Sequence, residues 1–422
     1  MSRKPTKTSN NSTVLNCQVP IFHKGETMNT FTLDPMGITV VGENAIGNLA
    51  QHVQTHGNRA FLVSDAGIQA AGVLETVTDV LTTHNIEWAA FTGVEPNPTD
   101  KNVEAGVEEL MEFGIEGTVI VLVGGGSVMD CGKYIAMAAP SKINDLSLAF
   151  SPELDDADKI DFNTLAPSSF VTEPCVPTIA VPTTSGTASE TNGGGLITRT
   201  EDHRKLTFTH PDVQPRAIVL DPLLTVGLPP TATATCGMDV LTHSIEAYTS
   251  TSNNPYSDGL ALQAIRITGK WLPTAVNDGS NIEARAAMQV ASHLAGRAFS
   301  SGPLLGLVHA MGHPISGTFG IAHGQTLATM LPHVMRFNLE VVSERYGDVG
   351  LALGVSPQPL EAISAIEALS EKVGTDKTLT DLGANKNDIE HLTTDALRDI
   401  IILSTPRYPN RDDVRGLYEL AL

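Results

Sequence analysis

The stretch Thr118-Val-Ile-Val-Leu-Val-Gly-Gly-Gly-Ser-Val-Met-Asp130 decides the fold of the first half of the chain. Its apolar run lacks polar alternation, which is typical of a strand buried on both faces of a parallel sheet. Three glycines, Gly124 to Gly126, then lead into a helical pattern. Glycines let a backbone approach a phosphate closely, and a helix N-terminus favours negative charge. We therefore expect a dinucleotide phosphate at this turn, with Ser127 capping the helix; a tight turn without a ligand is the alternative.

Apolar runs on either side of this stretch extend the same pattern. Strands are predicted at 59–65, 85–91, 178–181 and 217–220, with crossover helices at 68–83 and 100–113. Buried strands that alternate with helices predict a doubly wound α/β domain with a parallel sheet.

The pattern changes after Pro229-Pro230, where helical periodicity replaces the strands. Helices are predicted at 231–249, 258–276, 282–299, 360–373, 394–403 and 412–422. We therefore expect an α/β domain over 29–226 and an all-α domain over 227–422. Ligands of such proteins usually bind in the cleft between the two domains, beyond the carboxyl ends of the strands.

Two segments do not fit either domain. Residues 1–28 begin with a run rich in Ser, Thr, Asn and Lys, which we interpret as a flexible N-terminal tail. A transit peptide is the alternative, because the run is basic and lacks acidic residues. Residues 141–177 are acidic and contain several prolines, which predicts a long surface excursion.

The overall composition excludes several functions. The chain has 47 acidic and 26 basic residues and a formal net charge of −21, which argues against a nucleic-acid partner. No apolar run approaches the ~20 residues that cross a bilayer, so no membrane partner is expected. The four cysteines are far apart and form no Cys-x-x-Cys motif. That pattern fits a reducing, cytoplasmic location.

A second loop and one acidic residue add to the nucleotide signal. Pro182-Thr-Thr-Ser-Gly-Thr-Ala-Ser-Glu190 follows a predicted strand, and its hydroxyl groups suit contacts with phosphate or ribose; helix capping is the alternative. Asp65 ends another strand, on the same rim of the sheet as the glycines. Its carboxylate would accept from the ribose 2′-hydroxyl and repel a 2′-phosphate, which favours NAD over NADP. An ordinary acid at a strand end is the alternative.

Histidines and one aspartate in the second half have the spacing of metal ligands. Asp239 and His243 are four residues apart, as are His309 and His313, and His323 follows ten residues later. Residues at this spacing share one face of a helix. Buried His and Asp side chains need partners, which a shared cation would provide. Imidazole and carboxylate without thiolate suit Fe(II), Zn(II) or Mn(II).

With these motifs in place, the chain resembles the iron-containing (group III) alcohol dehydrogenase family from about residue 30 to the C-terminus. The resemblance rests on four strings in the same order: Gly124 to Asp130, Pro182 to Glu190, Gly237 to Glu246, and Gly306 to Gly324. It implies an N-terminal Rossmann-like domain and a helical C-terminal domain, the fold of dehydroquinate synthase. It also implies a homodimer or larger homo-oligomer.

The resemblance also assigns roles to individual residues. The implied metal ligands are Asp239, His243, His309 and His323, and His313 lies near the metal without binding it. The implied cofactor contacts are Asp65, Asn97, Gly125, Gly126, Ser127, Thr183, Thr184, Thr187 and Lys205.

The expected activity is NAD-dependent interconversion of a small primary alcohol or diol and its aldehyde, with Fe(II) as the expected metal. The metal would act as a Lewis acid, and His313 would relay a proton or orient the substrate. Gly193-Gly194-Gly195 stands where many members carry bulkier side chains, so we expect a widened pocket that accepts alcohols longer than ethanol. Relative to the pattern of this family, Ser301 to Leu304 holds one extra residue.

The sequence also bears on four other functions. A dehydroquinate-synthase-type lyase needs Lys and Arg for a phosphorylated substrate, yet the segments 239–250 and 297–325 carry only Arg297. Metal-free maleylacetate reductases are disfavoured because every ligand is present. A lactaldehyde or hydroxy-acid reductase of the same family stays open. The alternative from another class is a non-catalytic dinucleotide-binding assembly protein, which has no need of the full Asp and His set.

Overall fold

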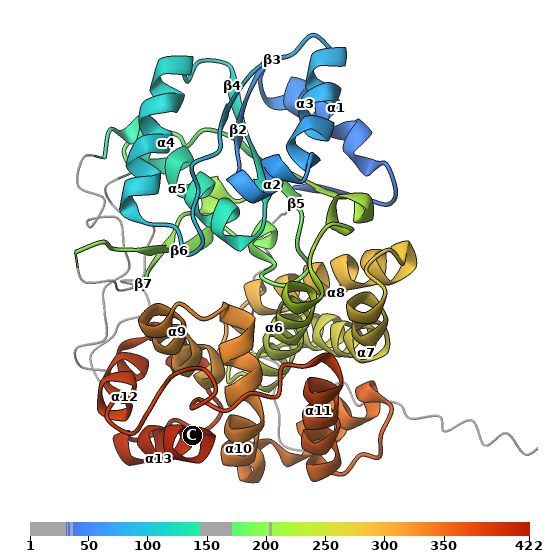
Figure 1. The fold of residues 1–422 in the computed structure, drawn as a ribbon, viewed down its shortest axis with the longest axis vertical. Coiled ribbons are helices and arrows are strands. Elements are labelled where there is room, and N and C mark those ends of the chain that lie inside the picture. The colour runs from blue at the N-terminus through green and yellow to red at the C-terminus, as the bar shows by residue number, and fades with distance from the viewer. Residues whose placement is uncertain (1–30, 32, 34–36, 144–170, 202–204) are drawn as a thin grey trace, which may run out of the picture.

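A computed structural model describes residues 31, 33, 37–143, 171–201 and 205–422. The chain forms an α/β part and a helical part, stacked one above the other in Figure 1. The tail predicted at 1–28 and most of the acidic excursion at 141–177 lie outside the described residues. No helix in the described ranges is both long and apolar enough to cross a membrane.

The α/β part is built on a six-stranded sheet in which every pairing is parallel. The strand order is β1-β8-β5-β4-β2-β3. The strands are β1 (Ile38–Val41), β2 (Arg59–Val63), β3 (Glu87–Phe91), β4 (Thr118–Gly124), β5 (Thr178–Pro182) and β8 (Ala217–Leu220). The predicted strands and the doubly wound fold are thus confirmed, but β1 was missed. This short edge strand has half-exposed residues and lacks the apolar run of a central strand.

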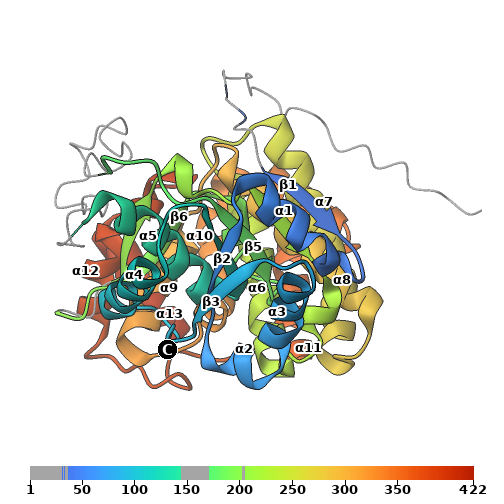
Figure 2. The same ribbon diagram turned by 90° about the horizontal axis from the view of Figure 1, so that it is seen from above.

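Helices cover both faces of the sheet. They are α1 (Leu49–His56), α2 (Ala66–Ala70), α3 (Val73–Thr83), α4 (Asp100–Phe113) and α5 (Gly126–Ser141). In both views α1 and α3 lie on one side of the strands and α4 and α5 on the other (Figures 1 and 2). Phe61 and Ile120 pack into the core under α4 and α5, whereas Leu62 and Val121 pack into the core under α1 and α3. All of β4 is buried, which explains its continuous apolar run.

An antiparallel hairpin, which the sequence did not predict, extends from the sheet toward the helical part. It consists of β6 (Gly194–Thr198) and β7 (Lys205–Thr209). β6 begins with two glycines, which have low strand propensity. The hairpin contacts α5 and approaches α9 (Leu307–Phe319).

The helical part packs around one nearly fully buried helix, α6 (Pro230–Thr249). Around it lie α7 (Pro255–Asn277), α8 (Ile282–Ser300), α9, α10 (His323–Leu353), α11 (Pro359–Val373), α12 (Ile389–Arg398) and α13 (Arg411–Ala421). The helix predicted at 394–403 was misplaced. Asp399 accepts the N–H of Ile401 and ends α12, so Ile400–Ser404 forms a separate 3₁₀ helix, η8.

Candidate metal centre and cofactor cleft

A single cleft of about 1030 Å³ joins the two parts of the molecule. One wall includes Gly126 and Ser127 at the start of α5, and the other includes Asp239 on α6 and His309 on α9. The two strongest signals in the sequence, the glycine turn and the histidine pairs, therefore face the same space.

Asp239 is the centre of the candidate metal site. Its Oδ1 atom lies 3.2 Å from Nε2 of His243, 3.6 Å from Nε2 of His309 and 3.9 Å from Nε2 of His323. Asp239 and His243 are one turn apart on α6, while His323 begins α10. The structure thus brings together all four side chains that the resemblance implied as ligands.

The donor atoms of this cluster fit a divalent cation. Asp239 and His309 are each 1% exposed, and neither Asp239 Oδ1 nor His309 Nε2 has a hydrogen-bond partner among the described residues. A buried carboxylate oxygen without a partner is costly, and a cation shared with the imidazoles removes that cost.

The protonation states that the cluster favours also suit a metal. Burial alone would raise the pKa of Asp239, but His243 and His309 hold it below its ordinary value. Burial lowers the pKa of His243 to about 4, against the pull of Asp239. Burial would lower the pKa of His309 as well, yet Glu246 and Asp239 raise it to about 9. A metal that binds His309 must therefore displace a proton near neutral pH.

Two carboxylates that the sequence analysis did not single out hold the histidines. Glu246 Oε2 accepts from Nδ1 of His309 at 2.5 Å, and Asp399 Oδ2 accepts from Nδ1 of His313 at 2.6 Å. Because both hydrogen bonds are made at Nδ1, the Nε2 atom of each ring is left for a metal or a substrate. Glu246 had a local signal, because it lies three residues after His243 on the same helix. Asp399 had none, because it lies between α12 and η8, far from His313 in the sequence.

The glycine turn is packed against the hydroxyl-rich loop that follows β5. The backbone N–H of Thr183 donates to the Gly124 carbonyl at 3.0 Å. A Cβ atom at Gly126 would lie 2.7 Å from Thr187, and one at Gly125 would lie 3.0 Å from Thr184. The glycines therefore permit close contact between two loops that are distant in sequence. The N-cap of α5 is Gly125, so the prediction that Ser127 caps this helix was wrong; Ser127 lies in the first turn.

The residues predicted to contact the cofactor divide into two groups. Asn97, Gly126, Ser127, Thr187 and Lys205 line the cleft. The described lining of the cleft does not include Asp65, Gly125, Thr183 or Thr184. Asp65 follows β2, which pairs with β4, and Oδ1 of Asp65 accepts the N–H of Ile68 at 2.9 Å. Asp65 therefore caps α2, and its contact with a ribose stays a prediction.

The triple glycine has a structural cause that differs from the expected wide pocket. A Cβ atom at Gly193 would lie 2.4 Å from the His210 carbonyl oxygen, and one at Gly195 would lie 2.8 Å from Asp130 and Phe208. Side chains here would collide with the protein itself. All three glycines line the cleft, and the close packing of the β6–β7 hairpin explains why they are glycines. A widened pocket stays a prediction.

A buried lysine fixes this hairpin to α5. Lys133 is fully buried, and its Nζ atom donates to Oγ and the carbonyl of Ser189 at 2.6 Å and to the Gly194 carbonyl at 2.7 Å. Asp130 accepts from Ser189 Oγ at 2.6 Å and from the Leu196 N–H at 2.9 Å. The string from Gly124 to Asp130 thus forms the glycine turn and, through Asp130, helps to anchor the hairpin beside it.

Comparison with known families matches nearly the whole chain. The model described as iron-containing alcohol dehydrogenase matches residues 37–222, and the model of the C-terminal part of the Fe-containing alcohol dehydrogenase family matches residues 233–422.

Individual relatives agree with these matches. The chain is 37% identical to 1,3-propanediol dehydrogenase of Klebsiella pneumoniae, over 91% of this chain and 97% of the relative. It is 35% identical to the probable alcohol dehydrogenase EutG of Escherichia coli K12, over 96% and 98%. Among solved structures, a 1,3-propanediol oxidoreductase superposes with a TM-score of 0.85 at 36% identity, over 93% of this chain and 100% of that chain. Sulfoacetaldehyde reductase from Bifidobacterium kashiwanohense in complex with NAD⁺ superposes with a TM-score of 0.81 at 25% identity, over 93% and 99%. With its parallel sheet, its helical second half and its cluster of one Asp and three His, the chain belongs to the iron-containing alcohol dehydrogenase family.

Proposed function

We propose that this protein is a metal- and NAD-dependent dehydrogenase that interconverts a small primary alcohol and its aldehyde. The observation that carries the proposal is the shared cleft, which places the N-terminus of α5 opposite the Asp239 cluster. A hydride donor and acceptor must meet in one space, and the shared cleft supports this arrangement. The cofactor is NAD, and Fe(II) is the favoured metal.

The residues of the chain have separate roles in this proposal. Asp239, His243, His309 and His323 hold the divalent metal, which supplies Lewis acidity that lowers the pKa of a hydroxyl group. The first turn of α5, with Ser127, directs backbone N–H groups toward the cofactor pyrophosphate. Thr187, Asn97 and Lys205 line the same wall. Burial lowers the pKa of Lys205 to about 8, so its charge depends on what occupies the cleft.

His313 is the proposed catalytic acid and base. Because Asp399 accepts from Nδ1, the opposite nitrogen of the ring is available for a proton from the substrate hydroxyl. His313 lines the cleft and stacks against His323, with 5.2 Å between ring centroids. It therefore stands beside the proposed metal ligands without belonging to the Asp239 cluster.

The substrate end of the cleft favours an apolar chain. Phe299 packs beside His243, with 4.9 Å between ring centroids, and Ile400 and Ile401 follow directly after Asp399. Leu304 and Leu305 line the same cleft. An uncharged aliphatic group buries apolar surface against this wall. Arg297 and Lys205 also line the cleft, so the assays below include a 2-hydroxy acid.

Enzyme assays test the proposal directly. Metal-free protein is supplied with Fe(II), Zn(II) or Mn(II) without oxygen, and NADH formation is followed with primary alcohols from ethanol to hexanol, with 1,3-propanediol and with a 2-hydroxy acid. We expect metal-dependent turnover, with kcat/KM rising toward the longer alcohols. A preference for the hydroxy acid would favour the reductase alternative. No turnover in either direction, with metal and NAD bound, would favour the non-catalytic assembly role.

Assembly, location and domain boundary are parts of the same proposal. β1 is an edge strand with Ile38 66% and Val41 51% exposed, which supports a homodimer or larger homo-oligomer. Cys131, Cys175 and Cys236 are unpaired, which supports a reducing cytoplasm. The boundary near Gly227 is supported by its place between η7 (Pro222–Thr225) and α6. Light scattering, cell fractionation and limited proteolysis test these three points.

A further inference from the structure

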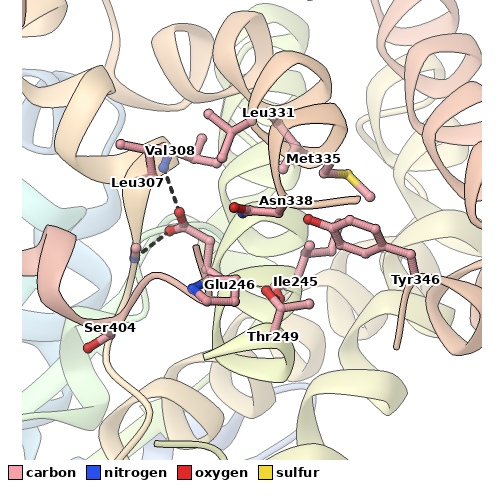
Figure 3. A pocket seen from close by; sticks show the side chains of 13 residues that line it. Ile245, Glu246, Thr249, Leu307, Val308, Leu331, Met335, Asn338, Tyr346 and Ser404 are labelled. Atoms are coloured by element: carbon pink, nitrogen blue, oxygen red, sulfur yellow. Dashed lines mark hydrogen bonds between the residues drawn. The ribbon is translucent and has the colours of Figure 1, made fainter. Parts of the chain in front are cut away.

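The carboxylate of Glu246 lies directly behind the proposed metal ligand His309. Three N–H groups converge on it: Gly306 N at 3.0 Å and His309 Nδ1 at 2.5 Å on Oε2, and Val308 N at 2.6 Å on Oε1. Glu246 is 7% exposed. Figure 3 shows its side chain extending from α6 toward the start of α9, where a dashed line joins it to Val308.

This arrangement is built for a carboxylate and for no other side chain. Both oxygens accept, and all three partners donate, so the amide of a glutamine would turn an N–H group toward at least one donor. Gly306 makes room for it, since a Cβ atom there would lie 3.0 Å from Glu246 Oε1. Because Nδ1 of His309 donates to Glu246, Nε2, which faces Asp239, is the nitrogen that a metal would bind after displacing its proton.

Behind Glu246 lies a small cavity between α6, α9 and α10. Its volume of about 10 Å³ is close to the least that can hold one water molecule. Glu246, Thr249, Asn338 and Tyr346 contribute polar groups to its wall, and the remainder is mostly apolar.

Asn338 is the second observation that points to a ligand in this cavity. It is 4% exposed, and its Oδ1 atom has no partner among the described residues. Asn338 and Tyr346 both line the cavity, and the Tyr346 hydroxyl points toward Asn338 in Figure 3. The cavity is therefore bordered by two acceptors, the Glu246 carboxylate and Asn338 Oδ1, and a water molecule is the smallest group that donates to both.

Helix α10 is kinked between Asn338 and Tyr346. Asn338 and Tyr346 would lie about 12 Å apart along a straight helix. The backbone is non-helical at Val342, with φ −130° and ψ 28°, and this kink lies between them. The same helix begins at His323, so α10 carries both a proposed metal ligand and the residues behind Glu246.

We propose that Glu246 is the positioning residue for His309, and that a buried water links it to Asn338 and Tyr346 on α10. Residues that orient a ligand imidazole in this way tune metal affinity without touching the metal. The proposal rests on His309 being a metal ligand, as proposed above.

The test measures Co(II) affinity and the Co(II) visible spectrum of metal-free protein, together with its thermal unfolding, so that no readout depends on turnover. For Glu246→Gln we expect a roughly 10- to 100-fold loss of affinity and an altered spectrum. The exposed Glu371→Gln on α11 is the matched control and should change neither. A purely structural Glu246 would lower the melting temperature of the metal-free protein and leave the Co(II) affinity within twofold, which would overturn the proposal.

Two further variants keep the test decisive if Glu246→Gln does not fold. Gly306→Ala keeps the carboxylate but displaces it, and should weaken Co(II) binding in the same direction. His309→Ala separates the two proposals: an unchanged affinity there refutes the ligand assignment, whereas a loss there with unchanged Glu246→Gln and Gly306→Ala refutes the positioning role. A crystal structure should show one ordered water between Glu246 and Asn338, and a dry cavity would refute the link to α10.

Discussion

His313 and Asp399 are 86 residues apart in the chain, yet Nδ1 of the histidine and Oδ2 of the aspartate lie 2.6 Å apart at the wall of the cleft. Burial would raise the pKa of Asp399, but His313 holds it below its ordinary value, so the aspartate is an anion at neutral pH. A carboxylate in this place fixes the ring orientation and stabilises a protonated imidazole.

We therefore expect Asp399→Asn to lower kcat by roughly 10-fold or more, at the low end of the roughly 10²- to 10⁴-fold that a positioned acid or base contributes. Metal content should stay unchanged, because Asp399 does not contact the Asp239 cluster, and KM for NAD should change little. Steady-state kinetics with metal analysis check this. A variant that loses metal in proportion to its activity would show that Asp399 acts on the metal site instead.

Metal binding should stabilise the fold through Asp239. At a thousandfold excess over Kd, a ligand specific for the folded state adds about 4 kcal/mol. We expect Zn(II) to raise the melting temperature of the native chain, and Asp239→Asn to abolish most of that rise. The exposed Asp79→Asn on α3 serves as the control. An equal rise in the Asp239 variant would show that the metal binds elsewhere.

The glycine turn should not tolerate a methyl group. Gly126→Ala places a Cβ atom 2.7 Å from Thr187, and overpacking of this kind costs about 1–3 kcal/mol. We expect weaker NADH binding, because the displaced loop lines the cofactor wall, together with a lower melting temperature. Gly227→Ala, with no atom within 4 Å of the added Cβ, is the matched control. Fluorescence titration with NADH decides, and normal affinity in Gly126→Ala would place the cofactor elsewhere.

Asp65 has two separable roles, a cap of α2 and a proposed barrier to a 2′-phosphate. Asp65→Ser keeps a capping oxygen but removes the charge, so stability should be retained while kcat/KM with NADP rises relative to NAD. Asp65→Ala should show the same change in preference and also lose about 0.5–2 kcal/mol of stability. An unchanged NADP to NAD ratio in both variants would leave Asp65 with the capping role alone.

Lys133 should be essential for stability. Replacing it by Met leaves Asp130 and two carbonyl groups without their buried cation, and breaking such a pair costs about 3–5 kcal/mol. We expect the urea midpoint to fall sharply for Lys133→Met and hardly at all for the exposed Lys372→Met. A small loss in both would mean that the hairpin is held mainly by its apolar contacts.

Most of the central fold could be predicted from local patterns. The continuous apolar run of β4 and the i, i+4 spacing of Asp239 and His243 both appear in the sequence, because the periods of strands and helices are local. The β6–β7 hairpin was missed because its two leading glycines resemble a loop, and their packing against Asp130 and His210 is visible only in three dimensions.

The sequence by itself determined the class of the fold, the glycine turn and the set of candidate ligands, since each is encoded by residue type at short spacing. Only the tertiary structure decided which groups meet: the glycine turn with the loop after β5, His309 with Glu246, and His313 with Asp399. These contacts join segments that are tens of residues apart in the chain. They depend on how helices pack around α6, and packing is set by the fit of many side chains at once rather than by any local period.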